Sequence, residues 1–521
     1  MKRILPIGRL LLAGLLILSI NQSCTDLEEE GFDFIGQENF FQTDEQLQAG
    51  FAEAYARLRA YCNHNNLFSI HEVSSDEAMI PQRGGDWFDG GIWLRTHRHE
   101  YQSDEEVVRN VWNTSYSAIN LINLLIETFE ANGAEASLVS ELRVLRAWWY
   151  GQLLDLYGNV PIVDATEGFD LPANNSRQEV YDFVVSEVTS NLDNLSKDVA
   201  SMYGRMHYYA AQALLAKVYL NAEVYTGTAQ WQAAADAADE IMNSGLFTLE
   251  DDYFTNFNAD NDASAEIIWQ IPYDRVNLQG FNLPQMTLHY NSQNTFNLEQ
   301  QPWNGYCTLA EFYNSYDDTD LRKGIYGDQK TRGNFLAGPQ FEFDGETPAL
   351  DAGYEQPNPD NPDAPIDPDG IELIFTPEIN EHFPNCLRQA GVRIGKYEFV
   401  DGATPELDND FPLYRLGDIM LVKAEALLRL NKDLDEALAL VNDIRTRAGV
   451  DDFSELNLDN LLAERGREMF AETWRRQDLI RFGKYGDEWG YKPASGREKE
   501  IFPIPLDEVN VNPNIVQNPS Y

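Results

Sequence analysis

The segment that decides the fold class runs from Leu413 to Val450 and reads LYRLGDIMLVKAEALLRLNKDLDEALALVNDIRTRAGV. Apolar side chains recur every three or four residues in its first part, and again after the break at Asn431-Lys432-Asp433. The first apolar stripe is Leu416, Ile419, Met420, Ala424, Leu427 and Leu428, and the second is Leu434, Leu438, Val441, Ile444 and Ala448. This spacing is typical of one face of an α-helix, so the segment is predicted to form a helix hairpin.

A similar unit runs from Met206 to Phe247. An Ala-rich stretch from Ala210 to Ala222 is followed by a break at Thr226-Gly227-Thr228 and by a second helical stretch that Trp231 opens. Two helix pairs of this length, with small residues at the contact positions, resemble tetratricopeptide units. Further helical patterns lie at 46–61, 107–129 and 138–157. Because about three stacked repeats are needed to bury a continuous core, we predict a mainly α fold, a tetratricopeptide-like helical repeat scaffold with long irregular loops and small β elements.

Three long segments interrupt the helical pattern. The stretch from Asp76 to Tyr101 carries four glycines among aromatic residues, and Leu278 to Tyr306 is rich in Asn and Gln around Trp303. Pro339 to Gly370 holds many Pro, Asp and Asn residues. Connections in a helical bundle need only about two to eight residues. We therefore predict that the helices form a scaffold and that the loops carry the function.

The charge balance excludes several classes of function. The 521 residues include 38 Lys and Arg against 85 Asp and Glu, which gives a formal net charge of −47. A field of this sign repels phosphate backbones and anionic membranes, which excludes binding through a basic surface. Hydrophobic residues make up 43% and aromatic residues 12% of the chain, enough for a large core, so charge-driven disorder is also excluded.

The first 23 residues have the pattern of a bacterial export signal. Lys2, Arg3 and Arg9 precede an apolar run from Leu10 to Ile20, and Cys24 follows Ser23. The run is too short to span a bilayer, and no other stretch is long and apolar enough to do so. The pattern resembles a lipoprotein signal in which Cys24 becomes the acylated N-terminus. The acidic stretch directly after it resembles the export tract of surface-displayed lipoproteins, although an ordinary solvated linker would have the same composition.

The other three cysteines are Cys62, Cys307 and Cys386. Their odd number and the lack of a CxxC spacing disfavour a disulfide framework and a zinc site. Three buried thiols are favoured over one disulfide plus one thiol, because the chain has a large core.

Four segments, taken in order, resemble one known family. They are LRVLRAWWYGQLLDLYGNVP at 142–161, the hairpin residues 414–426 with 441–449, the charged helix 464–481, and the tail formed by 502–505 and 512–521. Together they resemble the SusD/RagB family of outer-membrane nutrient-binding lipoproteins, over nearly the whole chain. The sequence departs from the family pattern at Ser520, where Gly is commoner.

This resemblance implies a non-catalytic, lipid-anchored protein of the outer-membrane surface. Family members cover a SusC-like TonB-dependent transporter, capture an oligosaccharide and deliver it for import. The helical face is the usual contact with the transporter, and the loop-rich face holds the sugar. The resemblance also implies one SusD-like unit after the signal peptide at 1–23, with an N-terminal half at about 24–250 and a C-terminal half at about 251–521, and no cofactor.

Candidate sugar-binding residues lie in two aromatic loops. A pyranose ring stacks its apolar face on an indole, and its hydroxyl groups need a few well-placed polar partners. The first loop, Arg83 to Trp93, contains the candidates Trp87 and Trp93 with Arg83, Asp86 and Asp89 as polar partners, whereas one or both Trp residues could instead pack beneath the loop. The second loop contains Trp303, Asn304 and Tyr306. Asp76 is a further polar candidate, and Arg393 and Tyr397 are weaker ones. If the loops meet in space, they form one aromatic platform.

Other charged and aromatic residues are interpreted as structural. In the helix 464–481, acidic and basic residues recur at intervals of three and four, which favours ion pairs along the helix or across to a neighbour. Trp148, Trp149 and Trp231 lie on helical stripes and are expected in the core.

Enzyme and metal-site interpretations have little support. The chain has no GxSxG, P-loop or HExxH pattern. His97-Arg98-His99 lacks a companion ligand cluster, and an acidic loop that includes Asp367 and Asp369 is favoured over a calcium site because its spacing does not suit an EF-hand. The sequence therefore predicts a binding protein for a neutral glycan, since an anionic polymer would need a local reversal of charge by a residue such as Arg83. The alternatives are a helical-repeat scaffold that binds a protein or peptide and a surface glycan hydrolase.

Overall fold

The computed structural model describes residues 43–166, 171–353 and 364–521. The chain divides into a unit up to Gly50 and a second unit from Phe51 to Tyr521. In the first unit, the structure describes the start of helix α2 (Asp44–Ala56). Its first turn is capped reciprocally, because the Gln46 amide donates to Thr43 Oγ1 and the Thr43 amide donates to Gln46 Oε1. Cys24 lies outside the described residues.

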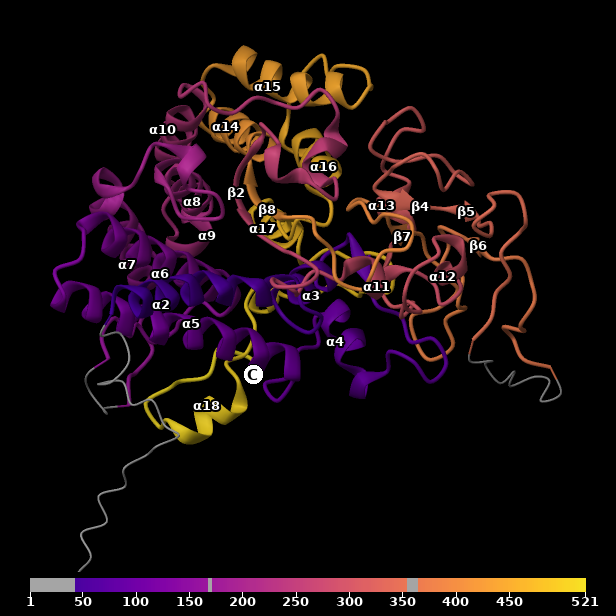
Figure 1. Ribbon diagram of the computed structural model, residues 1–521, viewed down its shortest axis with the longest axis horizontal. Helices are drawn as coiled ribbons and strands as arrows, with labels where there is room; N and C mark the ends of the chain where they lie inside the picture. Colours follow the sequence, from indigo (N-terminus) through magenta and orange to yellow (C-terminus); the bar gives the residue numbers. More distant parts are fainter. Residues whose placement is uncertain (1–42, 167–170, 354–363) are drawn as a thin grey trace, which may run out of the picture. The chain divides into compact units, whose positions relative to one another are not determined.

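The second unit is mainly helical (Figure 1). Its N-terminal helices are α3 (Leu67–Val73), α4 (Ile92–Arg98), α5 (Glu106–Ala131), α6 (Ala136–Leu156), α7 (Arg177–Asn191), α8 (Tyr208–Leu220), α9 (Ala222–Thr226) and α10 (Trp231–Met242). Short helices α11 (Leu283–Thr287), α12 (Ser292–Thr295) and α13 (Ala310–Tyr313) follow. The C-terminal helices are α14 (Leu416–Leu430), α15 (Leu434–Arg447), α16 (Leu458–Met469), α17 (Arg475–Arg481) and α18 (Leu506–Val511). Short 3₁₀ helices lie at Arg57–Cys62, Asp89–Gly91, Leu192–Asn194, Val199–Ser201, Tyr253–Phe257, Asn261–Ala263 and Arg497–Glu500.

The long helices pack as a continuous series. Helix α5 contacts α6, α6 contacts α7, α7 contacts α8, α8 contacts α10, α10 contacts α14, and α14 contacts α15. The two predicted hairpins, α8 with α10 and α14 with α15, are therefore stacked although a long insert separates them in the sequence (Figure 1). The predicted breaks are confirmed, since Gly227, Asn431 and Asp433 all have left-handed backbone conformations.

Helix α7 was not predicted, although its start carries a readable signal. Ser176 Oγ accepts from the Glu179 amide, and the Glu179 carboxylate accepts from the Ser176 amide. This capping box satisfies two backbone donors that would otherwise lack partners.

The strands are short and pair antiparallel, two at a time. The pairs are β1 (Ala78–Met79) with β3 (Cys307–Thr308), β2 (Ile267–Ile271) with β8 (Phe411–Arg415), β4 (Phe335–Leu336) with β7 (Arg393–Ile394), and β5 (Gly338–Pro339) with β6 (Ile374–Phe375). These pairs connect loops that are far apart in the sequence. In the β1–β3 pair, Ala78 opposes Thr308 and Met79 opposes Cys307.

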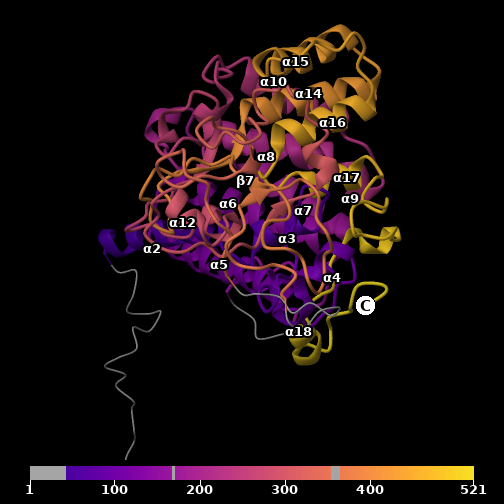
Figure 2. The same cartoon turned by 90° about the vertical axis from the view of Figure 1, so that its right-hand side faces the viewer.

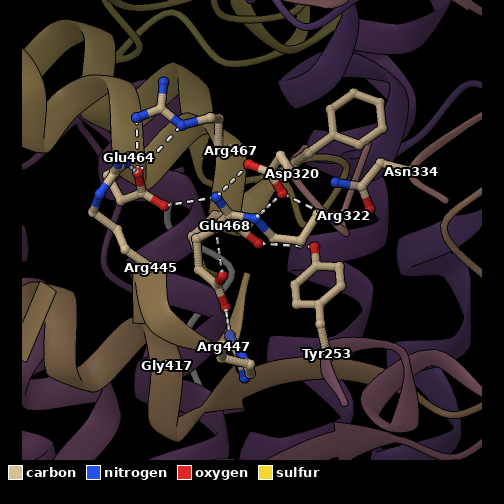
Figure 3. Close-up of polar contacts among 12 residues, drawn as sticks. Tyr253, Asp320, Arg322, Asn334, Gly417, Arg445, Arg447, Glu464, Arg467 and Glu468 are labelled. Carbon is tan, nitrogen blue, oxygen red and sulfur yellow. Dashed lines mark hydrogen bonds and ion pairs between the residues drawn. The ribbon is translucent and has the colours of Figure 1, made fainter. Parts of the chain in front are cut away.

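The charged residues of 464–481 form ion pairs, as predicted, and these pairs are buried (Figure 3). They belong to α16, to α17 and to the turn between them, and not to the single helix that was expected. Arg322 contacts Glu464 and Glu468 at 2.8 and 3.0 Å, and its side chain is fully buried. Arg415 contacts Glu266 at 2.8 Å, and Glu472 at 2.7 Å. These pairs join α16 and the turn that follows it to Arg322, within the insert between α10 and α14, and to Arg415, at the end of that insert.

The C-terminal tail packs against the end of α6. The Phe502 amide donates to Leu156 O at 2.7 Å, and Asn518 Nδ2 donates to Tyr157 O at 2.8 Å. A bond within the tail, from Asn518 Nδ2 to Phe502 O at 2.7 Å, completes the contact. Helix α18 lies beside α5 in both views of the ribbon (Figures 1 and 2), and Asp507 pairs with Arg109 of α5 at 3.5 Å. Two of the segments that carry the family resemblance therefore meet in space.

Other expectations about the core are also confirmed. Trp148 and Trp149 are buried, whereas Trp231 is half-buried at the start of α10. Cys62, Cys307 and Cys386 are buried, as expected for core thiols. Among the described residues, no helix has both the length and the apolar character that a membrane crossing requires.

Candidate functional site

The two predicted aromatic loops meet. Pairing of β1 with β3 fixes the chain just before the first loop against the chain just after the second. Trp87 Nε1 then donates to the Trp303 carbonyl oxygen at 2.7 Å. A direct hydrogen bond therefore connects the loops that carry the two leading candidates.

A histidine that sequence reasoning missed lies at the centre of this aromatic group. The His64 ring lies 5.1 Å from the Trp87 ring, 5.0 Å from Trp93 and 6.4 Å from Trp303, measured between centroids. Burial lowers the pKa of His64, so the ring is neutral near pH 7. His64 follows a short 3₁₀ helix and lies outside both loops in the sequence, so no local pattern identifies it.

We define the aromatic platform as Trp87, Phe88, Trp303 and Phe383. Trp87 is half-buried, whereas Trp303, Phe88 and Phe383 are 39%, 46% and 42% exposed. The Phe88 and Phe383 rings lie 5.9 Å apart. Exposed aromatic side chains gathered in this way offer stacking surfaces to a ligand. Phe383 was not predicted as a candidate.

Gly305 shapes the platform because it leaves room for an indole. A Cβ atom at this position would lie 2.3 Å from Trp87 Cζ2 and 2.5 Å from Cε2. The Trp87 ring therefore packs directly on the backbone of the second loop. Any larger residue at 305 would have to displace that ring.

Arg83 is buried and supports the platform from beneath. Its Nε donates to Asn304 O at 2.9 Å, its Nη2 donates to Ala390 O at 2.9 Å, and its Nη1 donates to Leu387 O. The guanidinium thus fastens three chain segments together. We assign Arg83 to the support of the site, in place of the ligand contact expected from the sequence, because its donors are already occupied and it is 1% exposed.

Arg393 and Asn304 belong to the same support. Arg393 Nη2 donates to Asn304 Oδ1 at 2.7 Å, and Asn304 Nδ2 donates to Arg388 O at 3.0 Å. Burial, reinforced by the charge of Arg83, lowers the pKa of Arg393 to about 9. Both residues are fully buried, so neither is placed to contact a ligand.

Three further aromatic candidates are also buried. Trp93 lies in α4, a helix that forms inside the predicted loop, and its Nε1 donates to Asp89 Oδ2 at 2.8 Å. Tyr306 contacts Ser69 Oγ through its hydroxyl, and Tyr397 donates to Ala471 O at 3.1 Å. For Trp93 the alternative of packing beneath the loop is the one observed.

The acidic candidates differ in their accessibility. Asp86 is exposed beside the platform and accepts a hydrogen bond from the Tyr290 hydroxyl, and Asp89 is exposed as well. Asp76 forms an ion pair with Arg475, with Nε to Oδ1 at 2.7 Å, so its charge is already matched. Asp86, Asp89 and the unpredicted Tyr290 are therefore the polar groups best placed for sugar hydroxyls.

Acidic residues of the predicted acidic loop surround the buried side chain of Arg388. Arg388 contacts Asp367 at 3.3 Å and Asp369 at 2.9 Å. Residues 354–363 of the same loop lie outside the described residues. Asp351 joins the cluster and accepts from His289 Nε2 at 2.8 Å. Within the described ranges, no group of three His, Cys, Asp or Glu side chains is arranged to hold a metal ion.

Two family patterns match the chain. The family described as "SusD family" matches residues 401–500, and the one described as "Starch-binding associating with outer membrane" matches residues 35–220. Starch-binding protein SusD of Bacteroides thetaiotaomicron is 28% identical over 419 residues, which cover 73% of this chain and 72% of that protein. SusD-like protein P38 of Formosa agariphila is 26% identical, with 97% of each chain covered.

Solved structures share the fold. Surface glycan-binding protein A of Bacteroides thetaiotaomicron, in complex with laminarihexaose, superposes with a TM-score of 0.71 at 21% identity. The match covers 91% of this chain and 99% of that one.

Proposed function

Because the chain belongs to the SusD/RagB family, we propose that it is a non-catalytic protein of the outer-membrane surface that binds a neutral glucan and delivers it to a SusC-like TonB-dependent transporter. The glucan is proposed because one relative is a starch-binding protein and one structural neighbour holds laminarihexaose. We further propose that Cys24 carries the lipid anchor.

The observation that supports glycan binding best is the convergence of the two loops at the aromatic platform. Trp87 and Trp303 come from segments far apart in the sequence, yet the indole of one is hydrogen-bonded to the backbone of the other. Neutral aromatic rings beside the carboxylates of Asp86 and Asp89 offer both interactions that a pyranose needs, stacking for its apolar face and acceptors for its hydroxyl groups.

Calorimetric titration of the purified chain with laminarihexaose and maltoheptaose tests the ligand. Trp303→Ala is expected to weaken binding about five- to ten-fold, since one stacking contact contributes on the order of 1 kcal/mol. Trp87→Ala should weaken binding to a similar extent, because it removes one ring and also the hydrogen bond from Trp87 Nε1 to Trp303 O. Trp231→Ala is the matched control, since this half-buried Trp lies in the helical array.

Three results would contradict the proposal. Unchanged glycan affinity in both Trp303→Ala and Trp87→Ala would show that the platform does not bind the glycan. Cleavage of the oligosaccharide would indicate a hydrolase, and absence of binding across a wider glycan panel would favour a scaffold for a protein or peptide. The transporter and the anchor are tested separately, by co-purification from outer membranes and by mass spectrometry of the native N-terminus.

A further inference from the structure

A cavity that shares no residue with the aromatic platform lies where α12 ends. It has a volume of about 360 Å³. Its walls come from four segments: residues 295–296, the segment 329–336, the turn 343–345 and the stretch 395–401. Ligand-binding pockets in proteins measure roughly 300 to 1,000 Å³. The cavity is therefore of a size for a small ligand such as a disaccharide.

Two polar groups of this cavity lack partners. Thr295 is 3% exposed, and its Oγ1 has no hydrogen-bond partner among the described residues. Arg332 Nε is also buried and has no hydrogen-bond partner among the described residues, although Nη2 of the same guanidinium donates to Lys396 O at 2.9 Å. A buried hydroxyl or N–H group without a partner costs about 1 to 3 kcal/mol. Both side chains line the cavity, and a rotation of either one would bring its unpartnered group to a ligand that can donate and accept hydrogen bonds.

Aromatic rings form part of the wall and the rim. Phe399 is half-buried and packs edge-to-face on Phe296, with ring centroids 4.8 Å apart. Phe343 is 58% exposed at the opening. These rings supply an apolar surface next to the unpartnered polar groups, which is the combination that a sugar ring requires.

The charges around the cavity are balanced. Lys330 and Arg332 provide two positive charges, and Glu398 and Asp401 provide two negative charges. Arg332 lies 3.9 Å from Glu398, and Glu398 Oε2 also accepts from the Ala259 amide at 2.8 Å. Such a balanced lining favours a neutral ligand rich in hydroxyl groups over an anion or a cation.

We propose that this cavity is a second sugar site, which binds one or two hexose units of a neutral glucan independently of the aromatic platform. The inference rests on the proposed function, since it assigns the same class of ligand. A protein with both sites can hold a branched or long glucan at two points, which strengthens attachment through a high effective concentration.

Separate signals from the two sites make the test specific. None of the described residues that line the cavity is a Trp, whereas the platform contains two. The part of the Trp fluorescence change that is lost in a Trp87→Ala, Trp303→Ala double variant reports on the platform, and calorimetry detects heat from both sites. The probes are laminaribiose and maltose, each titrated into the wild-type chain and into a Trp87→Ala, Trp303→Ala double variant.

Three variants address the cavity. Phe343→Ala removes an exposed ring, and Thr295→Val removes the unpartnered hydroxyl while retaining the shape of the side chain. Ile325→Ala is the control, because Ile325 is an exposed apolar residue that does not line the cavity. We expect the double platform variant to retain disaccharide binding. In that background, Phe343→Ala or Thr295→Val should weaken the binding about five- to ten-fold, and Ile325→Ala should leave it unchanged.

The outcomes separate this inference from the proposed function. The second site is wrong if the Trp87→Ala, Trp303→Ala variant loses all disaccharide binding. It is also wrong if neither Phe343→Ala nor Thr295→Val changes the binding that remains. Neither result contradicts the binding of laminarihexaose to the platform. If laminarihexaose fails to change the fluorescence but disaccharides still bind at the cavity, the platform is wrong and the second site stands. If neither disaccharide binds the wild-type chain, the inference is overturned.

Discussion

At the residue scale, the lack of a side chain at Gly305 sets the position of the Trp87 indole. Trp87 lies on the backbone of Gly305, and its Nε1 reaches Trp303 O because nothing projects from Gly305. Trp87 itself has a left-handed backbone, with φ of 63°. This conformation is uncommon for a bulky residue and is retained only where the surrounding contacts stabilise it.

Gly305→Ala is therefore expected to impair glycan binding without removing any aromatic ring. The new Cβ would lie 2.3 Å from the indole, so the ring must move and lose its bond to Trp303. We expect an affinity loss of about ten-fold in calorimetric titration with laminarihexaose. Gly85→Ala is the control, since a Cβ at Gly85 meets no atom within 4 Å. Equal affinity for the two variants would show that the indole position is unimportant.

A buried pair of glutamates gives the stability an unusual dependence on pH. Glu72 accepts from the Thr473 amide at 2.7 Å, and Glu77 accepts from the Ala471 amide at 3.1 Å. Ala471 and Thr473 both have left-handed backbones, which the two carboxyl groups help to hold. Burial raises the pKa of Glu72 to about 7, and burial together with the charge of Glu72 raises the pKa of Glu77.

Because the raised pKa favours the protonated form, the contribution of Glu72 to stability is complete below its unfolded pKa of 4.5 and is lost as pH rises through about 7. Glu72→Gln mimics the protonated carboxyl group. Between about pH 5 and pH 8.5, the wild-type chain should lose on the order of 2 kcal/mol of unfolding free energy relative to this variant. Urea denaturation at several pH values measures the difference, with Glu223→Gln as an exposed control. Parallel pH profiles for wild type and Glu72→Gln would contradict this prediction.

At the scale of elements, buried ion pairs connect the helices. Asp418 in α14 contacts Lys217 of α8 at 2.8 Å and Arg465 of α16 at 3.1 Å, and all three side chains are buried. Although burial opposes it, the two cations lower the pKa of Asp418, so the carboxylate is charged. One carboxylate thus holds three helices in register.

Asp418→Asn is expected to destabilise the fold by about 3 to 5 kcal/mol, because it leaves two buried cations short of a counter-charge. The matched control is Glu53→Gln in the exposed pair of Glu53 with Arg57, where the change should stay below about 1 kcal/mol. Chemical denaturation of both variants measures the contrast. A loss at Asp418 no larger than the loss at Glu53 would mean that the network does not support the fold.

Most of the helical scaffold could be predicted from the sequence, because the buried face of a helix carries apolar residues at intervals of three and four. Helices α5, α6, α8, α10, α14 and α15 all correspond to predicted segments. The stacking of α10 on α14 could not be predicted, since it depends on contacts across the long insert. The prediction of an irregular loop over 76–101 was wrong at Ile92–Arg98, which form α4 and bury Trp93. The glycines just before this segment had favoured a loop.

The candidate site was predictable in part. Trp87 and Trp303 could be selected because exposed-loop composition and residue type are local properties. The roles of Arg83 and Asn304 could not, because a polar side chain in a loop has the same local pattern whether it faces a ligand or clamps backbone carbonyls from below. His64, Tyr290 and Phe383 reach the platform only through folding, so they could not be selected.

At the scale of the whole molecule, a large share of the positive charge lies in the interior. Arg83, Arg146, Arg322, Arg388, Arg393, Arg415, Arg465 and Arg476 are among the largest fully buried side chains. Buried carboxylates such as Glu464, Glu468 and Asp478 match these cations, so the excess of acidic residues in a chain of formal net charge −47 lies among its more exposed residues. Such a surface repels polyanions and exerts little force on neutral polymers.

We therefore expect the affinity for laminarin to be almost independent of salt. Sulfated laminarin should bind more weakly at about 0.05 M NaCl and recover part of its affinity at about 0.5 M, because the screening length shortens to a few ångströms. Titrations of both polymers at the two salt concentrations measure the effect. Tighter binding of the sulfated polymer at low salt would indicate a local positive surface that overrides the net charge.

The order of the ion-pair partners along the chain has a consequence for biogenesis. Arg322 and Arg415 are synthesised well before Glu464 and Glu468, which complete their network. A nascent chain that ends before α16 would bury these cations without their full set of counter-charges, at a cost of about 3 to 5 kcal/mol each. We therefore expect native packing to wait until synthesis is almost finished. For the exported protein that we propose, a chain that folds this late can still be threaded through a translocation pore.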